Sequence, residues 1–142
     1  MELIVASPGE PTATGQLSGG SGNAAAILHE IATCLADLAV NGSTATIDLL
    51  AIPLTPGDHR QLEEILGQGA VVVQLTANGV SDIYETLFPG ACRVIHRNEA
   101  AEVVADLIEV CRIPDIVTTP IEDLALGVLR LEQRLSEMRD AR

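Results

Sequence analysis

Residues 70–111 alternate between short β-type stretches and turn-forming pairs, and this alternation constrains the fold more than any other feature. The turn-forming pairs are Asn78-Gly79, Pro89-Gly90 and Asn98-Glu99. Each pair separates two stretches that are rich in valine, isoleucine and other strand-forming residues. Connections this short join neighbouring antiparallel strands. The pattern therefore predicts an antiparallel meander.

The last stretch of this series, residues 102–111, is compatible with two structures. Three of its apolar residues also have helical spacing, namely Val103, Leu107 and Val110. We favour a strand, because a hairpin turn at Asn98 would return the chain alongside residues 92–97.

Two helices and one strand are expected before the meander. Apolar residues recur at helical spacing from Asn23 onward, and Asn41-Gly42 ends this first helix. Residues 45–49 then alternate between apolar and polar, which is typical of a strand with one buried face. A short second helix begins at Thr55-Pro56, where a capping hydroxyl precedes a proline, and it ends at Gly67.

A final helix is expected after Thr119-Pro120-Ile121-Glu122, which is typical of a capping box with proline at the first helical position. Its apolar residues follow the spacing of a heptad seam: Ile121, Leu124, Val128, Leu131, Leu135 and Met138. A seam this short favours packing on the helix's own sheet over a dimer contact. However, Leu126 and Leu129 add apolar surface outside the seam. The candidate partner surface comprises Leu124, Val128, Leu131 and Leu135.

These elements predict an α+β (mixed α/β) fold in the order α-β-α-β-β-β-β-α, with an antiparallel sheet of about five strands packed by two or three helices. A chain of 142 residues suffices for one core. We expect a flexible leader at residues 1–22, rich in proline, glycine and serine, and an α/β domain at 23–118. Residues 119–142 form the C-terminal helix, packed on the domain or used for dimerisation.

Charge and composition exclude several classes of function. The net charge is −12, with 20 acidic and 8 basic residues, and aromatic residues make up 1% of the chain, so nucleic acid is not an expected partner. All eight basic residues are arginines, which excludes a Walker-type phosphate loop and a Schiff-base lysine. We find no apolar run of about 18 residues and no basic region at the start. We therefore expect a cytoplasmic protein without membrane insertion.

No catalytic, cofactor-binding or metal-binding residues are predicted. His29 and Cys34 share a helix but point about 140° apart, and neither His59, His96, Cys92 nor Cys111 adds ligand spacing. The three cysteines contain no C-x-x-C pair, so we expect free structural thiols. A G-x-S-x-G nucleophile motif is missing, and its nearest match at residues 19–23 lies in the leader. Asp48 is the acid most expected within the sheet, on its open face or bonded to a turn.

Several short motifs occur in a fixed order from Ile27 to Val117. They include ILHEI at residues 27–31, IDL at 47–49, IPLTP at 52–56 with Asp58, LGQG at 66–69, and IPDI at 113–116. In this order and spacing the segment resembles the HupH/HyaF hydrogenase expression and formation proteins. The motif positions are Asp48, Pro53, Asp58, Gly67, Gly69, Pro89, Gly90 and Pro114. The chain departs from the family at Ala91-Cys92, where tryptophan often follows the Pro-Gly turn, and at Ala70, where an acidic residue is common.

The resemblance implies a non-enzymatic cytoplasmic accessory protein in the maturation of nickel–iron hydrogenases. It implies a chaperone that holds the immature iron–sulfur small subunit before export through the twin-arginine pathway. The expected partners are the small-subunit precursor and other maturation accessory proteins, and no cofactor is expected. A homodimer through the last helix stays open as an alternative to its packing on the domain. Two alternatives stay open. One is a homo-oligomeric structural or regulatory module, and the other is a small hydrolase with a cleft around His96.

Overall fold

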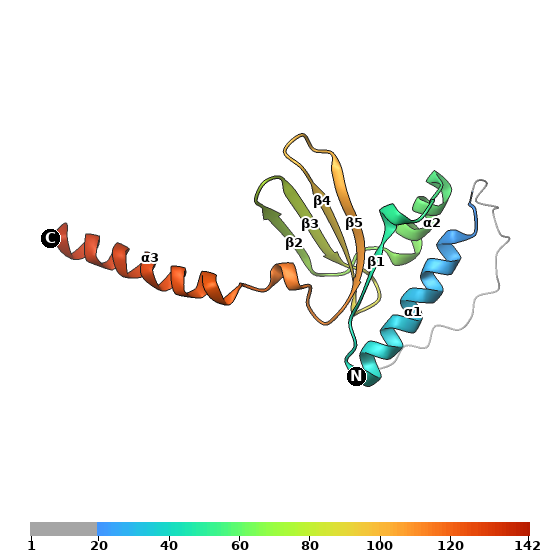
Figure 1. Ribbon diagram of the computed structural model, residues 1–142, viewed down its shortest axis with the longest axis horizontal. Coiled ribbons are helices and arrows are strands. Elements are labelled where there is room, and N and C mark those ends of the chain that lie inside the picture. The colour runs from blue at the N-terminus through green and yellow to red at the C-terminus, as the bar shows by residue number, and fades with distance from the viewer. Residues whose placement is uncertain (1–19) are drawn as a thin grey trace.

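A computed structural model describes residues 20–142 of the chain. It contains three α-helices, two short 3-10 helices and five strands (Figure 1). In chain order these are α1 (Asn23–Asn41), β1 (Ala45–Asp48), η1 (Leu49–Ala51), α2 (Pro56–Leu66), β2 (Val72–Thr76), β3 (Val80–Glu85), β4 (Ala91–Arg97), β5 (Val103–Val110), η2 (Asp115–Val117) and α3 (Ile121–Asp140). The predicted fold class and element order are confirmed.

The five strands form one antiparallel sheet in the order β1-β5-β4-β3-β2. Strands β2 to β5 are successive neighbours, so the predicted meander is correct. The chain turns back at Asn98, whose N–H donates to the carbonyl of Glu102 at 2.9 Å. This hairpin brings β5 alongside β4 and confirms the strand at the ambiguous stretch. Strand β1 then closes the far edge, with Ala45 opposite Val110.

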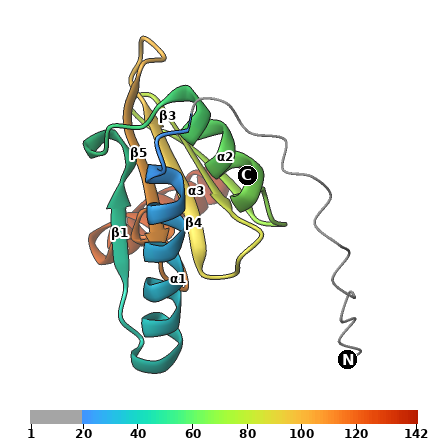
Figure 2. The same cartoon turned by 90° about the vertical axis from the view of Figure 1, so that its right-hand side faces the viewer.

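The hydrophobic core lies between one face of the sheet and the helices α1 and α2 (Figure 2). It comprises Ala24, Ile27, Ile31, Ile47, Leu49, Leu62, Leu66, Ala91, Ile108 and Val110. Burying each aliphatic side chain of this size contributes about 1.5–3 kcal/mol relative to exposure. Packing on the sheet therefore decides which side of each helix faces inward.

The predicted ends of the first two helices agree with the structure. Gly42 follows α1 with φ 71°, a left-handed conformation that glycine adopts readily, and its N–H donates to the carbonyl of Leu38 at 2.9 Å. At α2, the Thr55 hydroxyl accepts from the N–H of Asp58, and the Asp58 carboxylate accepts from the N–H of Thr55. This is a complete capping box with Pro56 at the first helical position.

The predicted flexible leader needs a correction at its end. Residues 1–19 lie outside the described part of the chain. Ser21, however, is fixed by two hydrogen bonds to the buried carboxylate of Asp58, from its N–H at 2.9 Å and from its hydroxyl at 2.6 Å. A linker had been expected here because serine and glycine supply little apolar surface. The buried carboxylate of Asp58 holds this segment in place, because a buried charge needs hydrogen-bond donors and Ser21 supplies two of them.

The segment between β5 and α3 crosses the other face of the sheet. Pro114 is buried there, beside a cavity of about 190 Å³ whose lining includes Val73, Ile83 and Val117. Ile83 and Val94 are almost fully buried and, by strand alternation, lie on the face opposite the helices. This crossing directs the chain away from the side covered by α1 and α2 (Figure 1).

Helix α3 corrects two expectations. It projects from the sheet on the side opposite α1 and α2, and each of its residues is exposed, so it does not pack on its own sheet (Figures 1 and 2). Its N-cap is Pro120 without a side-chain capping bond, so the predicted Thr119 capping box is wrong. Proline provides no side-chain acceptor, and the N–H of Asp123 donates instead to the backbone carbonyl of Pro120 at 3.0 Å.

Helix α1 is long and apolar enough to cross a membrane, by length and composition, although the sequence analysis found no such segment. Within the described residues it is the single helix with this property. It carries Glu30 and Asp37 and supplies Ala24, Ile27 and Ile31 to the core. A core helix of a globular domain has the same composition.

Candidate interaction surface

An apolar groove separates parts of α1 and α2. It has a volume of about 180 Å³ and is lined by Leu28, Ile31, Ala32, Leu35, Ile65, Leu66 and Phe88. Phe88 reaches this place because its chain segment is tied to the end of α2, where the N–H of Leu87 donates to the carbonyl of Leu66 at 2.8 Å. The groove can therefore accept apolar side chains of a bound segment.

The helical layer around this groove is acidic. Helices α1 and α2 expose four carboxylates, those of Glu30, Asp37, Glu63 and Glu64, against the single guanidinium of Arg60. Such a surface attracts a basic segment over long range and repels an acidic one.

A second apolar surface runs along α3. It contains the four predicted partner residues Leu124, Val128, Leu131 and Leu135, each at least 50% exposed. Ile121 and Met138 extend the stripe at the two ends of the helix. A row of large apolar side chains this exposed is typical of a contact surface for protein.

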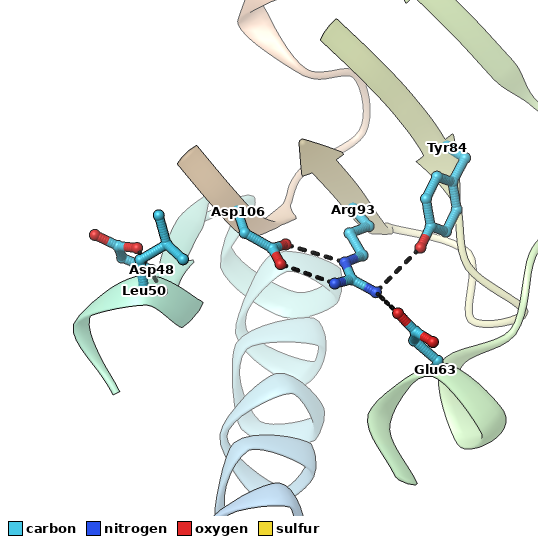
Figure 3. Close-up of polar contacts among 6 residues, drawn as sticks. All are labelled: Asp48, Leu50, Glu63, Tyr84, Arg93 and Asp106. Atoms are coloured by element: carbon cyan, nitrogen blue, oxygen red, sulfur yellow. Dashed lines mark hydrogen bonds and ion pairs between the residues drawn. The ribbon is translucent and has the colours of Figure 1, made fainter. Parts of the chain in front are cut away.

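Three of the family-motif positions support the loop between β1 and α2. Asp48 caps η1, because its carboxylate accepts from the N–H of Leu50 at 3.0 Å (Figure 3). The carbonyl of Pro53 accepts from the side-chain amide of Asn23 at 2.9 Å. The Asp58 carboxylate accepts from Ser21 and Thr55, and the hydrogen bond from the Ser21 hydroxyl is the main cause that lowers its pKa from 3.8 to about 2. The two carboxylates and the Pro53 carbonyl thus have structural partners.

The other motif positions lie in turns. Gly67 ends α2, and the N–H of Gly69 donates to the carbonyl of Glu85 at 2.6 Å. Pro89-Gly90 forms the turn between β3 and β4, where Gly90 has φ 96° and lies against Leu35 of α1. Pro114 precedes η2 on the open face of the sheet. These motif positions thus lie at turns and at the ends of helices and strands.

A buried arginine links α2 to the sheet (Figure 3). Nε and Nη2 of Arg93 on β4 donate to the two carboxylate oxygens of Asp106 on β5, at 3.0 and 2.8 Å. Its Nη1 donates to Glu63 and to the Tyr84 hydroxyl at 3.2 and 3.4 Å. Burial alone would lower the pKa of Arg93, but the hydrogen bonds and charge of Asp106 raise it above its ordinary value. Each of the three guanidinium nitrogens therefore donates to a neighbouring side chain, and the group links β4, β5, β3 and α2.

Histidine and cysteine side chains do not converge on a metal site within residues 20–142. Ser81 and His96 do form a pair, with 2.5 Å between Oγ and Nδ1. In the described structure no carboxylate is hydrogen-bonded to His96, although a nucleophile–base pair needs such a group to orient the base.

The groove and the Ser21–Asp58 tie were not predicted. The groove residues of α1 and α2 are apolar, as residues that pack in a core are, and no sequence signal shows that the two helices leave a gap. Asp58 was identifiable, because threonine at 55 followed three residues later by an acidic side chain is the capping-box pattern. The pairing of Arg93 with Asp106 could not be predicted, because the sequence shows only that each is a charged residue within a strand.

Comparisons with known proteins agree with this scaffold. Residues 22–138 match the family model described as "HupH hydrogenase expression protein, C-terminal conserved region". The solved structure of "Hydrogenase expression protein HupH from Thiobacillus denitrificans ATCC 25259" is similar with a TM-score of 0.79 and 43% identity, over 83% of this chain and 98% of that one.

Two curated relatives carry related names. "Hydrogenase expression/formation protein HupH" of Rhodobacter capsulatus is 32% identical over 128 residues, which cover 90% of this chain and 46% of the relative. "Hydrogenase expression/formation protein HoxQ" of Azotobacter vinelandii is 32% identical over 95 residues, which cover 67% of this chain and 32% of the relative. The chain thus spans less than half the length of these relatives.

Proposed function

The chain belongs to the family of HupH hydrogenase expression proteins, and from this premise we propose that it is a non-enzymatic accessory protein of hydrogenase maturation. It acts in the cytoplasm as a chaperone for the immature iron–sulfur small subunit of a nickel–iron hydrogenase. It holds this precursor before export through the twin-arginine pathway, together with other maturation accessory proteins.

The observation that carries this proposal is the apolar groove between α1 and α2 within an acidic helical layer. A twin-arginine signal combines arginines with an apolar stretch, and in the precursor this segment is not part of a folded domain. Its positive charge is complementary to the exposed carboxylates, and its apolar side chains can occupy the apolar groove. Ser81 and His96 support a hydrolase less well, because no carboxylate is hydrogen-bonded to His96 in the described structure.

Co-purification tests the proposal. The full chain should recover the small-subunit precursor that still carries its twin-arginine signal, and it should not recover the mature, exported subunit. Ile65→Asp places a carboxylate in the groove, and we expect at least a tenfold loss of recovered precursor, because a buried unpaired charge is unfavourable. Val40→Asp is the matched control, since Val40 is 81% exposed on α1 and lies outside the groove.

The effect of salt on the rates of binding and release separates electrostatic steering from apolar contact. Association should slow as the ionic strength rises, because the screening length falls to about 8 Å at 0.15 M. A complex that has already formed should persist at moderate salt, because its apolar contacts are not screened. Stopped-flow mixing of the chain with a fluorescent signal peptide measures both rates.

A deletion strain gives the contradicting outcome. If hydrogenase activity and small-subunit levels are unchanged without this protein, under aerobic and anaerobic growth, and no precursor is recovered with it, the maturation proposal is wrong. A homo-oligomeric interaction module would then replace it, and the exposed stripe of α3 is the observation that favours this second candidate.

A further inference from the structure

The apolar stripe of α3 has the spacing of a helix-to-helix contact. Its six residues recur at alternating steps of three and four, and their exposed fractions lie between 50% and 81%: Ile121, Leu124, Val128, Leu131, Leu135 and Met138. Knobs-into-holes packing requires this seam. The helix projects from the domain, so the whole stripe is accessible to another helix (Figure 1).

The charge of α3 distinguishes it from the rest of the chain. Residues 121–142 contain five acidic residues and four arginines, a net charge of −1, whereas residues 1–120 contain fifteen and four, a net charge of −11. A basic client would be attracted to the domain rather than to this helix. A second copy of the same helix meets almost no net repulsion there.

The domains decide the direction in which two such helices pair. A helix of 20 residues is about 30 Å long. Parallel pairing would place two copies of the domain at residues 23–118, each with a net charge of −9, side by side, because each domain precedes α3 in the chain. Antiparallel pairing places them at opposite ends of the pair, well beyond the screening length of about 8 Å at physiological salt.

The flanking residues favour the same direction. In antiparallel register, Ile121 meets the partner's Met138, Leu124 meets the partner's Leu135, and Val128 meets the partner's Leu131. The seam is then flanked by Arg134 opposite the partner's Gly127 and by Ala125 opposite the partner's Glu132. Parallel pairing would instead set Arg134 against the partner's Arg139, and like charges at these positions oppose pairing. Gly127 has open space around its Cα, which admits the partner's arginine.

We propose that two copies of this chain form a homodimer through antiparallel pairing of α3, with the two acidic domains at opposite ends of the helix pair. The client groove between α1 and α2 stays accessible in this arrangement, because it lies on the other side of the sheet (Figure 2). The dimer is independent of the proposed chaperone function.

The mass in solution gives the first test. Light scattering of the full chain at rising concentration should show a transition from one copy to two. Leu131→Glu should weaken association at least a hundredfold while the circular dichroism spectrum and thermal unfolding of the domain are unchanged, since α3 is exposed. Leu126→Glu is the matched control, because Leu126 lies outside the seam, and it should leave the association constant within threefold of the wild type.

Cross-linking tests the direction. Under mild oxidation, Ala125→Cys mixed with Glu132→Cys should give a disulfide-linked dimer, whereas neither variant alone should exceed the wild type, whose three native thiols supply the background. A disulfide of Leu124→Cys with itself would mean parallel pairing, because only in that direction does Leu124 meet the partner's Leu124, and it would overturn the arrangement.

Three other outcomes overturn the proposal. A wild-type chain that stays monomeric at high concentration excludes the dimer, and hydrogen-exchange protection of α3 in that monomer would mean that the helix folds back on its own sheet. A dimer that Leu131→Glu leaves intact uses another surface. A monomer that gains α3 protection only with the precursor makes the helix a client site. Ile65→Asp should leave dimerisation unchanged, so failure of the client proposal is distinguishable.

Discussion

The guanidinium of Arg93 and the carboxylate of Asp106 form a paired, two-bond contact across β4 and β5, with N–O distances of 3.0 and 2.8 Å. Both residues are 6% exposed. Arg93 also reaches Glu63, so this single side chain connects two strands and α2 (Figure 3). A buried charge must be paired, and here the pair also fixes the distance of the helix from the sheet.

Breaking this pair should strongly destabilise the domain. We expect Asp106→Ala to lower the free energy of unfolding by about 3–5 kcal/mol, because Arg93 would keep a buried charge without its partner. Glu63→Ala is the control, and it should change the free energy by about 1 kcal/mol or less, because that carboxylate is 60% exposed. Urea denaturation measures both. The double variant Arg93→Leu/Asp106→Leu should recover most of the loss, and a further loss instead would contradict the unpaired-charge explanation.

Asp58 should make stability depend on pH in acid. Its pKa is about 2 in the folded chain against an ordinary value of 3.8, chiefly because of the hydrogen bond from Ser21. A lowered pKa stabilises the fold above pH of about 4, and this contribution is lost as the pH falls toward 2. The stability advantage of the wild type over Asp58→Asn should therefore shrink between pH 4 and 2 in urea titrations. In Ser21→Ala, NMR titration should show a higher pKa for Asp58; an unchanged value would mean that Ser21 does not hold the carboxylate.

Cys111 should react slowly with alkylating reagents. Burial is the main cause that raises the pKa of its thiol from 9.0 to about 11, and the negative charges of neighbouring groups add to the effect. At pH 8 this leaves roughly a hundredfold less thiolate than an ordinary cysteine has. Peptide-resolved mass spectrometry after iodoacetamide treatment should therefore show slow labelling in the native chain and fast labelling in urea.

All three cysteines should be free, and the purified protein should contain no stoichiometric metal. Thiol titration of the denatured, unreduced chain should find Cys34, Cys92 and Cys111, and elemental analysis should find neither zinc nor iron in proportion to the chain. About one metal ion per chain, or a thiol count of one, would contradict this prediction.

Gly69 should not tolerate a side chain. A Cβ atom at this position would lie 2.7 Å from the carbonyl oxygen of Thr86, which is backbone and cannot easily move. We expect Gly69→Ala to lower the free energy of unfolding by about 1–3 kcal/mol. Gly20→Ala is the control, because its Cβ would have no neighbour closer than 3.5 Å, and it should change stability by about 0.5 kcal/mol or less. Equal effects in thermal melts would mean that crowding at Gly69 is not the cause.

The prediction of strands and turns succeeded because its signals are local. Asn78-Gly79 forms the turn between β2 and β3, where Asn78 has φ 51° and Gly79 has φ 120°, a backbone shape that these two residues favour. The position of α3 was harder to predict. The same heptad seam suits packing on a sheet or on another helix, and the sequence analysis favoured the sheet, whereas the helix is exposed along its whole length.

The sequence alone determined the elements, their order and the family, because periodicity, capping residues and turn pairs act within a few residues of one another. The tertiary structure decided which charges meet and which apolar faces remain uncovered. Ser21 and Asp58 are 37 positions apart, and Arg93 and Asp106 are 13 apart, so their hydrogen bonds exist only once the sheet and α2 are assembled. The groove between α1 and α2 and the exposed stripe of α3 could not be predicted for the same reason. The apolar spacing of a helix indicates which face tends to be buried, but it does not identify the surface that covers that face.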